Sequence, residues 1–215
     1  MSGPHRSSDG KAVAARAGAA LVTPGARLAL GTGSTVEAAL PALAAVPGLV
    51  ATPTSEVIAA RAAAAGITLV PVQSSYDFYL DGADQVSPEG HAVKGSWGAH
   101  VREKTLALLA GRRILVCDRS KLVEKITGPV PVAVLPYFAS LYGADADSQI
   151  DDNGLVVVRL GAGEVIDSPA EWDAEMCRRP GVVMTGVFPA GFVERIITGH
   201  PDGSVSLVAD GSDPA

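Results

Sequence analysis

Short apolar strands alternate with helices as far as Asp118, and this alternation limits the possible folds more than any other feature of the sequence. The stretch LALGTGSTVEAALPAL runs from an apolar strand through Gly31 and Gly33 into a helix that is expected to begin near Ser34 or Thr35. The stretch TSEVIAARAAAAGITLV repeats this order, with a helix cap, a helix, a terminating glycine and another strand. Alternation of this kind is typical of parallel βαβ units. The sequence therefore predicts an α/β fold, with ligands bound beyond the carboxyl ends of the strands.

The strands become more closely spaced after about residue 130. Here the pattern predicts two strands, a helix and two further strands, over residues 131–135, 155–160, 169–177, 182–187 and 195–198. The chain is long enough for one large domain with a small one attached. We therefore predict polar, disordered ends, a parallel-sheet domain and a small α+β domain: a disordered tail at 1–10, a tail at 210–215, the main domain at 11–129 with parts of 180–210, and the small domain at 130–179.

The formal charge of −6 argues against a nucleic-acid partner, because phosphate backbones are bound by clusters of Lys and Arg and no basic run occurs. Cys117 and Cys177 lie far apart and outside any CxxC or metal spacing, so a reduced compartment and a role in core packing are expected. The sequence has neither a basic-apolar leader nor an apolar run long enough to cross a membrane. These features predict a soluble, cytoplasmic protein with no membrane partner.

The glycine turn between the first strand and its helix is a candidate anion site. Thr32, Gly33, Ser34 and Thr35 would place backbone N–H groups and hydroxyls at a helix N-terminus, where an anion is the natural ligand. The turn is neither a Walker loop nor a complete GxGxxG motif. A tight structural turn with a capped helix explains the same residues equally well.

Two carboxylates follow the next predicted buried strand, in the stretch Asp81-Gly82-Ala83-Asp84. Spacing around a glycine can turn both toward one cavity, where they could bind sugar hydroxyls or transfer protons. The alternative is an Asp-Gly turn with a helix cap. The four histidines form no recognisable metal set with these carboxylates, so no metal site is predicted.

A lysine and a glutamate lie close to these aspartates in the sequence. Lys94 begins a glycine-containing loop, and Glu103 is expected in the first turns of the next helix. Beside apolar walls the pKa of Glu103 would rise and make it a base near neutral pH, while Lys94 would stabilise negative charge on a substrate. The alternative is that Arg102, Glu103 and Lys104 form a solvated helix face.

Together these motifs resemble the type A ribose-5-phosphate isomerase family, through most of the chain. LGTGSTV is similar to its substrate loop, DGAD to its carboxylate pair, KGSWGAHVREK to its lysine loop and catalytic glutamate, and DRSKLVEK to its later substrate-lysine segment. PVPVAVLP, DDNG and PGVVMTGVF are similar to its small-domain and C-terminal landmarks. The resemblance implies a Rossmann-like parallel-sheet domain with a small ferredoxin-like α+β domain, no metal or cofactor, and a homodimer or homotetramer.

The resemblance also implies a reaction, the interconversion of ribose 5-phosphate and ribulose 5-phosphate through a cis-enediolate. Glu103 would be the base, Lys94 would face the developing oxyanion, and Asp81 and Asp84 would hold sugar hydroxyls and assist ring opening. The substrate-binding positions implied by the motifs are Thr32, Gly33, Ser34, Thr35, Gly82, Ala83, Gly95, Ser96, Trp97 and Lys121. The partner would be a small pentose phosphate.

Three departures from the family pattern concern the substrate. Ser96 and Trp97 interrupt a glycine run, so an indole must lie close to the sugar, and Gln85 replaces the acid that usually follows DGAD. Residues 137–150 leave room for little more than a loop, so the small domain is expected to be trimmed. A modified pentose phosphate as substrate, a sugar-phosphate sensor and an inactive paralogue therefore remain as alternatives. The sensor is disfavoured because no basic helix-turn-helix precedes residue 12.

Overall fold

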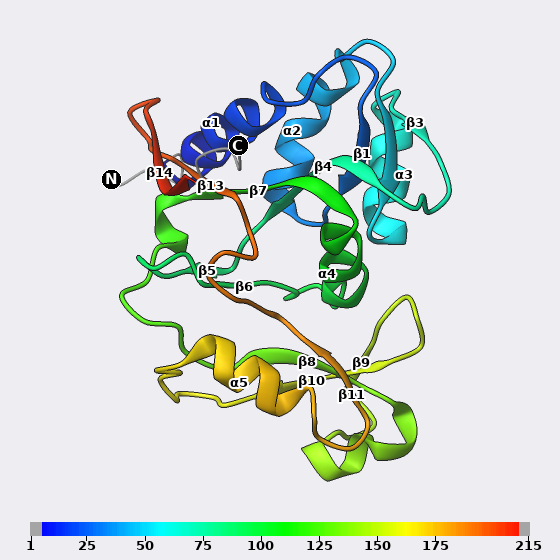
Figure 1. Ribbon diagram of the computed structural model, residues 1–215, viewed down its shortest axis with the longest axis vertical. Coiled ribbons are helices and arrows are strands. Elements are labelled where there is room, and N and C mark those ends of the chain that lie inside the picture. Colours follow the sequence, from blue (N-terminus) through cyan, green and yellow to red (C-terminus); the bar gives the residue numbers. More distant parts are fainter. Residues whose placement is uncertain (1–5, 211–215) are drawn as a thin grey trace.

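A parallel sheet with helices on both faces forms the larger part of the computed structural model, which describes residues 6–210 (Figure 1). Within these residues seven strands pair in the order β14-β13-β7-β4-β1-β2-β3, and β14 alone is antiparallel to its neighbour. The elements are α1 Arg6–Ala19, β1 Arg27–Leu30, α2 Ser34–Ala44, β2 Val50–Pro53, α3 Glu56–Ala64, β3 Thr68–Leu69, β4 Tyr76–Gly82, α4 His100–Leu108, β7 Ala110–Asp118, η1 Arg119–Lys121, β13 Arg195–Gly199 and β14 Val205–Asp210. The predicted α/β class and Rossmann-like sheet are confirmed.

The first helix starts earlier than expected. Because α1 begins at Arg6, the prediction of a disordered tail at 1–10 is wrong from Arg6 onward. Asp210 ends β14 and so is not part of a tail. Residues 1–5 and 211–215 lie outside the described residues.

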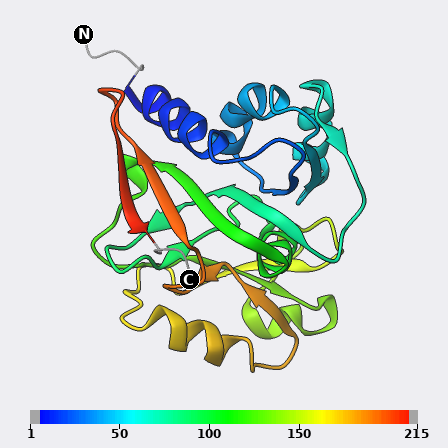
Figure 2. The same ribbon diagram turned by 45° about the horizontal axis from the view of Figure 1, so that its top comes forward.

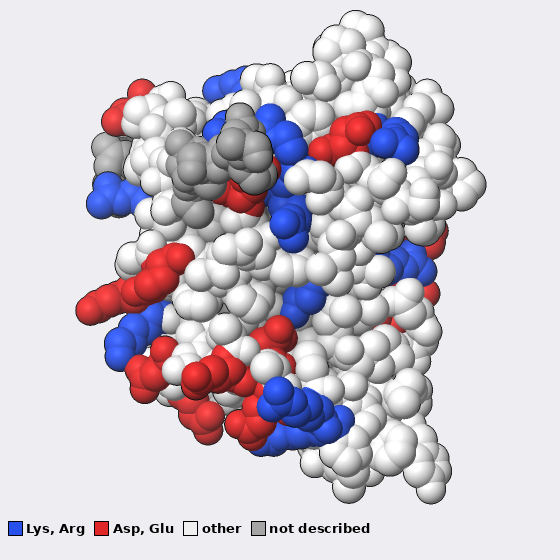
Figure 3. All heavy atoms as spheres, in the orientation of Figure 1, with Lys and Arg blue, Asp and Glu red and all other residues white. Residues whose placement is uncertain are grey.

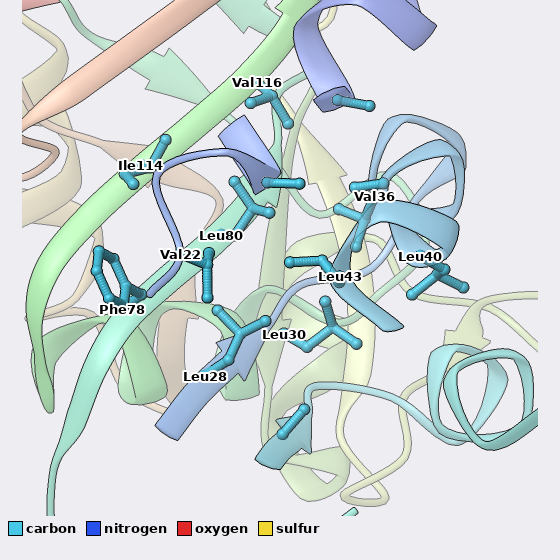
Figure 4. Packing of buried hydrophobic residues seen from close by; sticks show 14 of the residues in the cluster. Val22, Leu28, Leu30, Val36, Leu40, Leu43, Phe78, Leu80, Ile114 and Val116 are labelled. Carbon is cyan, nitrogen blue, oxygen red and sulfur yellow. The ribbon is translucent and has the colours of Figure 1, made fainter. Parts of the chain in front are cut away.

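Alternating side chains give the sheet its two apolar faces. Phe78 and Leu80 pack with residues of α1, α2 and α3 on one face, as Figure 4 shows, whereas Tyr79 packs with residues of α4 on the other. The same alternation separates Ile114 from Leu115 on β7. Because side chains of a strand point to opposite faces in turn, Asp81 must share the α4 face with Tyr79.

The chain changes direction between β1 and β4. β1 lies between β2 and β4, so the connections that leave β1 and β4 diverge and their carboxyl ends border one crevice. Gly31, directly after β1, donates its N–H to Leu80 O at 2.9 Å, and a Cβ at Gly31 would lie 1.9 Å from Asp81 Cγ. Only glycine therefore lets the turn after β1 lie against the end of β4.

The smaller domain is an antiparallel sheet with one α-helix. Its strands pair in the order β11-β8-β10-β9, and its elements are β8 Val130–Val134, η2 Pro136–Tyr142, β9 Gln149–Ile150, β10 Val156–Leu160, α5 Pro169–Met176 and β11 Val182–Thr185. With η2 in the place of a first helix, this is the ferredoxin-like order. Residues 137–150 hold a 3₁₀ helix and a two-residue strand, so the expectation of little more than a loop was too sparse. The small sheet also includes β11, so the expected boundary at 179 falls too early.

A short sheet connects the two domains. It has the order β12-β6-β5, from β5 Gln85–Val86, β6 Ala92–Val93 and β12 Val187–Phe188. Figures 1 and 2 agree that α1, α2 and α3 lie on the side of the main sheet away from the small domain, whereas α4 lies toward it. The catalytic candidates Lys94 and Glu103 follow β6 and begin α4, so they lie between the main sheet and the small domain.

Charge is mixed on the surface, and the two cysteines differ in exposure. Lys and Arg are mixed with Asp and Glu on the face that Figure 3 shows, rather than gathered into one basic tract. Over residues 6–210, no helix is long and apolar enough to cross a membrane. Cys117 is buried, and burial raises its pKa to about 11, but Cys177 is exposed, so core packing is the wrong role for it.

Candidate active site

A cavity lies where the ends of β1 and β4 meet α4 and the loop that precedes it. Every residue predicted for the site except Asp81 lines this cavity, and one unpredicted lysine joins them; the lining residues are Lys11, Thr32, Gly33, Ser34, Thr35, Gly82, Ala83, Asp84, Lys94, Gly95, Ser96, Trp97, Glu103 and Lys121. Asp81 is fully buried directly behind the wall, in contact with Lys94. The residues of four sequence motifs thus converge on one space.

The glycine turn places the start of α2 at one end of the cavity. α2 begins at Ser34, and the first N–H groups of a helix have no partner within the helix. Thr32 turns its hydroxyl away toward the start of α3, where Oγ1 lies 2.9 Å from Thr54 Oγ1 and 2.8 Å from Ser55 Oγ. The turn therefore offers backbone donors and the Ser34 hydroxyl, rather than the Thr32 hydroxyl, to an anion.

Two lysines flank this turn. Lys11, from α1, donates from Nζ to Ser34 Oγ at 3.2 Å, and Lys121 approaches from η1 after β7. Reasoning from the sequence missed Lys11, because it lies in an ordinary helical segment with no motif around it. Two ammonium groups beside a helix N-terminus provide the positive charge that a phosphate requires.

Three charged side chains form a buried cluster at the other end of the cavity. Lys94 Nζ lies 2.8 Å from Asp81 Oδ2 and 3.3 Å from Glu103 Oε2, and all three side chains are at most 3% exposed. Asp81 also accepts hydrogen bonds from the Tyr79 hydroxyl and, at 2.6 Å, from the Gly82 N–H. Glu103 Oε2 is buried, and its only polar contact among residues 6–210 is the Lys94 ammonium. Asp81 is therefore held by three groups, whereas Glu103 Oε2 is held by Lys94 alone within the described residues.

Burial shifts the proton affinities of this cluster. Burial raises the pKa of Glu103 to about 8, the Asp81 carboxylate adds to the rise, and the Lys94 ammonium partly offsets it. Burial also raises the pKa of Asp81, against the opposing effects of Lys94 and Tyr79. Burial disfavours the Lys94 ammonium, but Asp81 and Glu103 together outweigh it and raise the pKa of Lys94. A lysine that stays charged thus lies beside a glutamate that can exchange a proton near neutral pH.

The loop from Lys94 to Gly98 forms the side of the cavity. Gly95 has φ +95°, and a Cβ there would lie 2.6 Å from His100 Cβ, so the loop needs glycine at this position. The Ser96 N–H donates to Asp84 Oδ2 at 3.2 Å, which holds the second predicted aspartate against the loop. Trp97 is 67% exposed and lines both this cavity and a neighbouring one formed with Thr54, Arg102 and residues 149–153. Trp97 therefore borders two cavities.

Gln85 is turned away from the site. Its amide accepts from Thr127 N–H at 2.9 Å and donates to Thr127 O at 2.7 Å. A carboxylate could accept but not donate in this pair. The change from acid to amide at residue 85 therefore fits a contact with the β7–β8 connection rather than a change in the cavity.

The chain is similar to known proteins over most of its length. The family model of ribose 5-phosphate isomerase A (phosphoriboisomerase A) matches residues 50–203. The chain belongs to the ribose 5-phosphate isomerase A family. The ribose-5-phosphate isomerase A of Halobacterium salinarum is 38% identical over 200 residues, which cover 85% of this chain and 88% of that protein. The same enzyme from Leptothrix cholodnii is 32% identical over 213 residues, covering 92% of this chain and 96% of that protein.

Solved structures of the ribose 5-phosphate isomerase A family share the fold. A D-ribose-5-phosphate isomerase in complex with phospho-erythronic acid superposes with a TM-score of 0.84 at 26% identity, covering 94% of this chain and 98% of the other. Because both chains are matched almost end to end, the small domain described above is part of the shared fold. Over residues 6–210 of this family member, no group of three or more His, Cys, Asp or Glu side chains could hold a metal ion.

Proposed function

We propose that this chain interconverts ribose 5-phosphate and ribulose 5-phosphate, with Glu103 as the base. The observation that carries the proposal is the buried Glu103 carboxyl, whose Oε2 lies 3.3 Å from the Lys94 ammonium, in a cavity whose other end is a lysine-flanked helix N-terminus. Membership of the isomerase family and similarity to curated enzymes of that name support it.

The proposed reaction moves one proton between neighbouring carbons. Glu103 removes the proton from C2 of the open-chain aldose, and the C1 carbonyl oxygen becomes an oxyanion of the cis-enediolate. Lys94 stabilises that oxyanion, and its contact with Asp81 at 2.8 Å keeps the ammonium in place. Glu103 returns the proton to C1, and a hydroxyl proton moves from O2 to O1, which gives the ketose. A glutamate with a pKa of about 8 can both accept and return a proton near neutral pH.

The remaining predicted residues act in binding. Asp84, in the wall beside the Ser96 N–H, contacts sugar hydroxyls and assists ring opening. The phosphate occupies the start of α2, between Lys11 and Lys121. Phospho-erythronic acid, the ligand in complex with one related isomerase, supports this proposal, because its carboxylate resembles an enediolate and its phosphate matches that of the substrate.

The same proposal extends to the cofactor, the cellular location and the oligomeric state. The enzyme requires no cofactor, works in the cytoplasm on a small sugar phosphate, and forms a homodimer or homotetramer without nucleic acid or membrane. The strongly exposed Tyr137 and Leu141 on η2 are apolar side chains that subunit contact would cover. The division at residues 129 and 130 is supported by the separate sheets on either side of it.

A second candidate is isomerisation of a modified pentose phosphate, and Trp97 favours it. This residue borders both the active cavity and the neighbouring one, so a substituent that extended from the sugar into the second cavity would contact it. A purified sample is incubated with ribose 5-phosphate in D₂O, and ribulose 5-phosphate formation and C1–C2 deuteration are followed by NMR. Turnover with deuterium exchange is expected. Absence of both, with turnover of another pentose derivative, would replace the first proposal by the second.

A further inference from the structure

The small domain contacts the backbone of the lysine loop with two side chains. Arg159, on β10, donates from Nη2 to Ser96 O at 2.9 Å. Gln149, on β9, donates from Nε2 to Trp97 O at 2.8 Å. Two successive carbonyls of the cavity wall are thus held from the same small sheet, whose strands β9 and β10 pair with each other.

The main domain holds the same loop from the opposite side. Ser96 donates its N–H to Asp84 Oδ2 at 3.2 Å, so the Ser96 residue is bonded to a carboxylate through its N–H and to a guanidinium through its C=O. Before the loop, the Lys94 N–H donates to Gly186 O at 2.8 Å. The Ser96–Trp97 segment is therefore held between the two domains.

Within the loop one backbone hydrogen bond, from Gly98 N–H to Gly95 O at 2.8 Å, closes a turn around Ser96 and Trp97. Glycines flank the Ser96–Trp97 segment, with φ +95° at Gly95 and +82° at Gly98, and glycine allows more backbone freedom than any other residue. The side chains of Ser96 and Trp97 are themselves exposed and so add little packing. The two cross-domain hydrogen bonds are consequently a large share of what keeps the loop in one conformation.

Arg159 is well placed for this role. It is an exposed residue of β10, directly paired with Pro131 of β8, so its backbone is fixed by the small sheet while its side chain reaches the main domain. A guanidinium donates several hydrogen bonds in a fixed plane and stays charged at every relevant pH. Hydrogen bonds from charged donors are roughly twice as strong as neutral ones.

We propose that Arg159 is a positioning residue for the isomerisation: by holding the Ser96 carbonyl it keeps Lys94 and the cavity wall in their catalytic places, and Gln149 is the second tether. This inference rests on the proposed function of the site. The small domain then contributes to catalysis through the loop, without touching the substrate. Neither residue belongs to the motifs that first indicated the reaction.

The pH dependence of kcat/KM reports on the position of Lys94 relative to Glu103, and so on the effect of Arg159. The groups that act on the Glu103 carboxyl are Asp81 and Asp84, which favour its protonated form, and Lys94, which favours the ionised form. If the loop relaxes and the 3.3 Å contact of Lys94 Nζ with Glu103 lengthens while the contact with Asp81 is kept, the two aspartates raise the pKa of Glu103 further. The acid limb of the kcat/KM profile should then move to higher pH.

The experiment compares Arg159→Ala, Arg159→Lys and wild type, with Arg179→Ala as the matched control. Arg179 is an exposed small-domain arginine that pairs with Glu175 one helical turn away at 2.9 Å. For Arg159→Ala we expect kcat to fall about tenfold, KM for ribose 5-phosphate to change less than about threefold, and the acid limb to move upward. Arg159→Lys should restore part of kcat, and Arg179→Ala should match wild type.

Hydrogen exchange of the loop amides supplies a readout that does not depend on turnover. Faster exchange at residues 96–98 in Arg159→Ala, with unchanged exchange in the main sheet, is expected. Wild-type kcat in Arg159→Ala, or a loss that Arg179→Ala reproduces, would overturn the inference. If wild type does not turn over ribose 5-phosphate, the proposed function fails, whereas unchanged loop exchange in Arg159→Ala overturns the tether itself.

Discussion

Replacing Glu103 by glutamine should greatly lower kcat while making the folded protein more stable. Glutamine keeps the size and shape of the side chain but cannot take up a proton. Because a positioned base contributes about 10²–10⁴-fold to a rate, we expect kcat to fall about 10³-fold. Affinity for phospho-erythronic acid should stay within about tenfold, since the phosphate end of the cavity is untouched.

The expected gain in stability follows from the proton affinity of the buried carboxyl. Folding raises the pKa of Glu103 from 4.5 to about 8. The native state therefore binds this proton more tightly than the unfolded chain does, and wild-type stability falls as the pH rises from about 4.5 through 8. At about 1.4 kcal/mol per pKa unit, the cost is about 1 kcal/mol at pH 5 and about 4 kcal/mol at pH 8. Glutamine, which does not ionise, avoids this cost.

Urea unfolding at pH 5 and pH 8 measures this difference. The free energy of unfolding of Glu103→Gln should exceed that of wild type by a margin that grows by about 3 kcal/mol between the two pH values. Glu175→Gln is the control, because this exposed glutamate contributes only a surface ion pair and should show no such trend. An equal margin at both pH values would refute the argument from burial, and wild-type turnover in Glu103→Gln would exclude Glu103 as the base.

Three further predictions concern pH, the phosphate and the indole. With a Glu103 pKa of about 8, the ionised fraction rises from about 9% at pH 7 to about 91% at pH 9, so kcat/KM should rise about tenfold; a flat profile would contradict this. Lys11→Met should raise KM for ribose 5-phosphate about tenfold with kcat within about threefold, whereas Lys125→Met, at an exposed lysine paired with Asp167, should change neither. Trp97→Gly should increase kcat/KM for ribose 5-phosphate several-fold by widening the cavity. Trp97→Ala is the control that separates the effect of lost side-chain volume from that of added backbone flexibility. Unchanged kinetics for every sugar phosphate tested would place the ring outside the site.

Local patterns were enough to predict that the charged residues of the candidate site lie together. Asp81 and Tyr79 share a face because strand side chains alternate, and Glu103 reaches the cluster because it lies in the first turn of the helix that follows the lysine loop. The glycine turn and the DGAD stretch each end a parallel strand, and such ends meet at one edge of a sheet. These placements follow from the alternation of side chains along a strand and from neighbours in the sequence, so they could be predicted from the sequence.

Contacts between distant segments could not be anticipated in this way. Lys11 lies 23 residues from the serine it contacts, and Arg159 lies 63 residues from Ser96. Gln85 turns toward Thr127, 42 residues away, although its position after DGAD suggested a change in the pocket. No periodicity or motif connects such pairs, because their separation in space is set by how helices, sheets and domains that are distant in the sequence pack together.

The sequence by itself thus determined the fold class, the placement of the glycine turn and the grouping of Asp81, Lys94 and Glu103, because each depends on alternation or on near neighbours. Only the tertiary structure decided that Trp97 borders two cavities, and that Arg159 and Gln149 hold its loop from the small domain. The physical reason is that glycines leave a loop many backbone conformations, and its partners in the two domains select one of them.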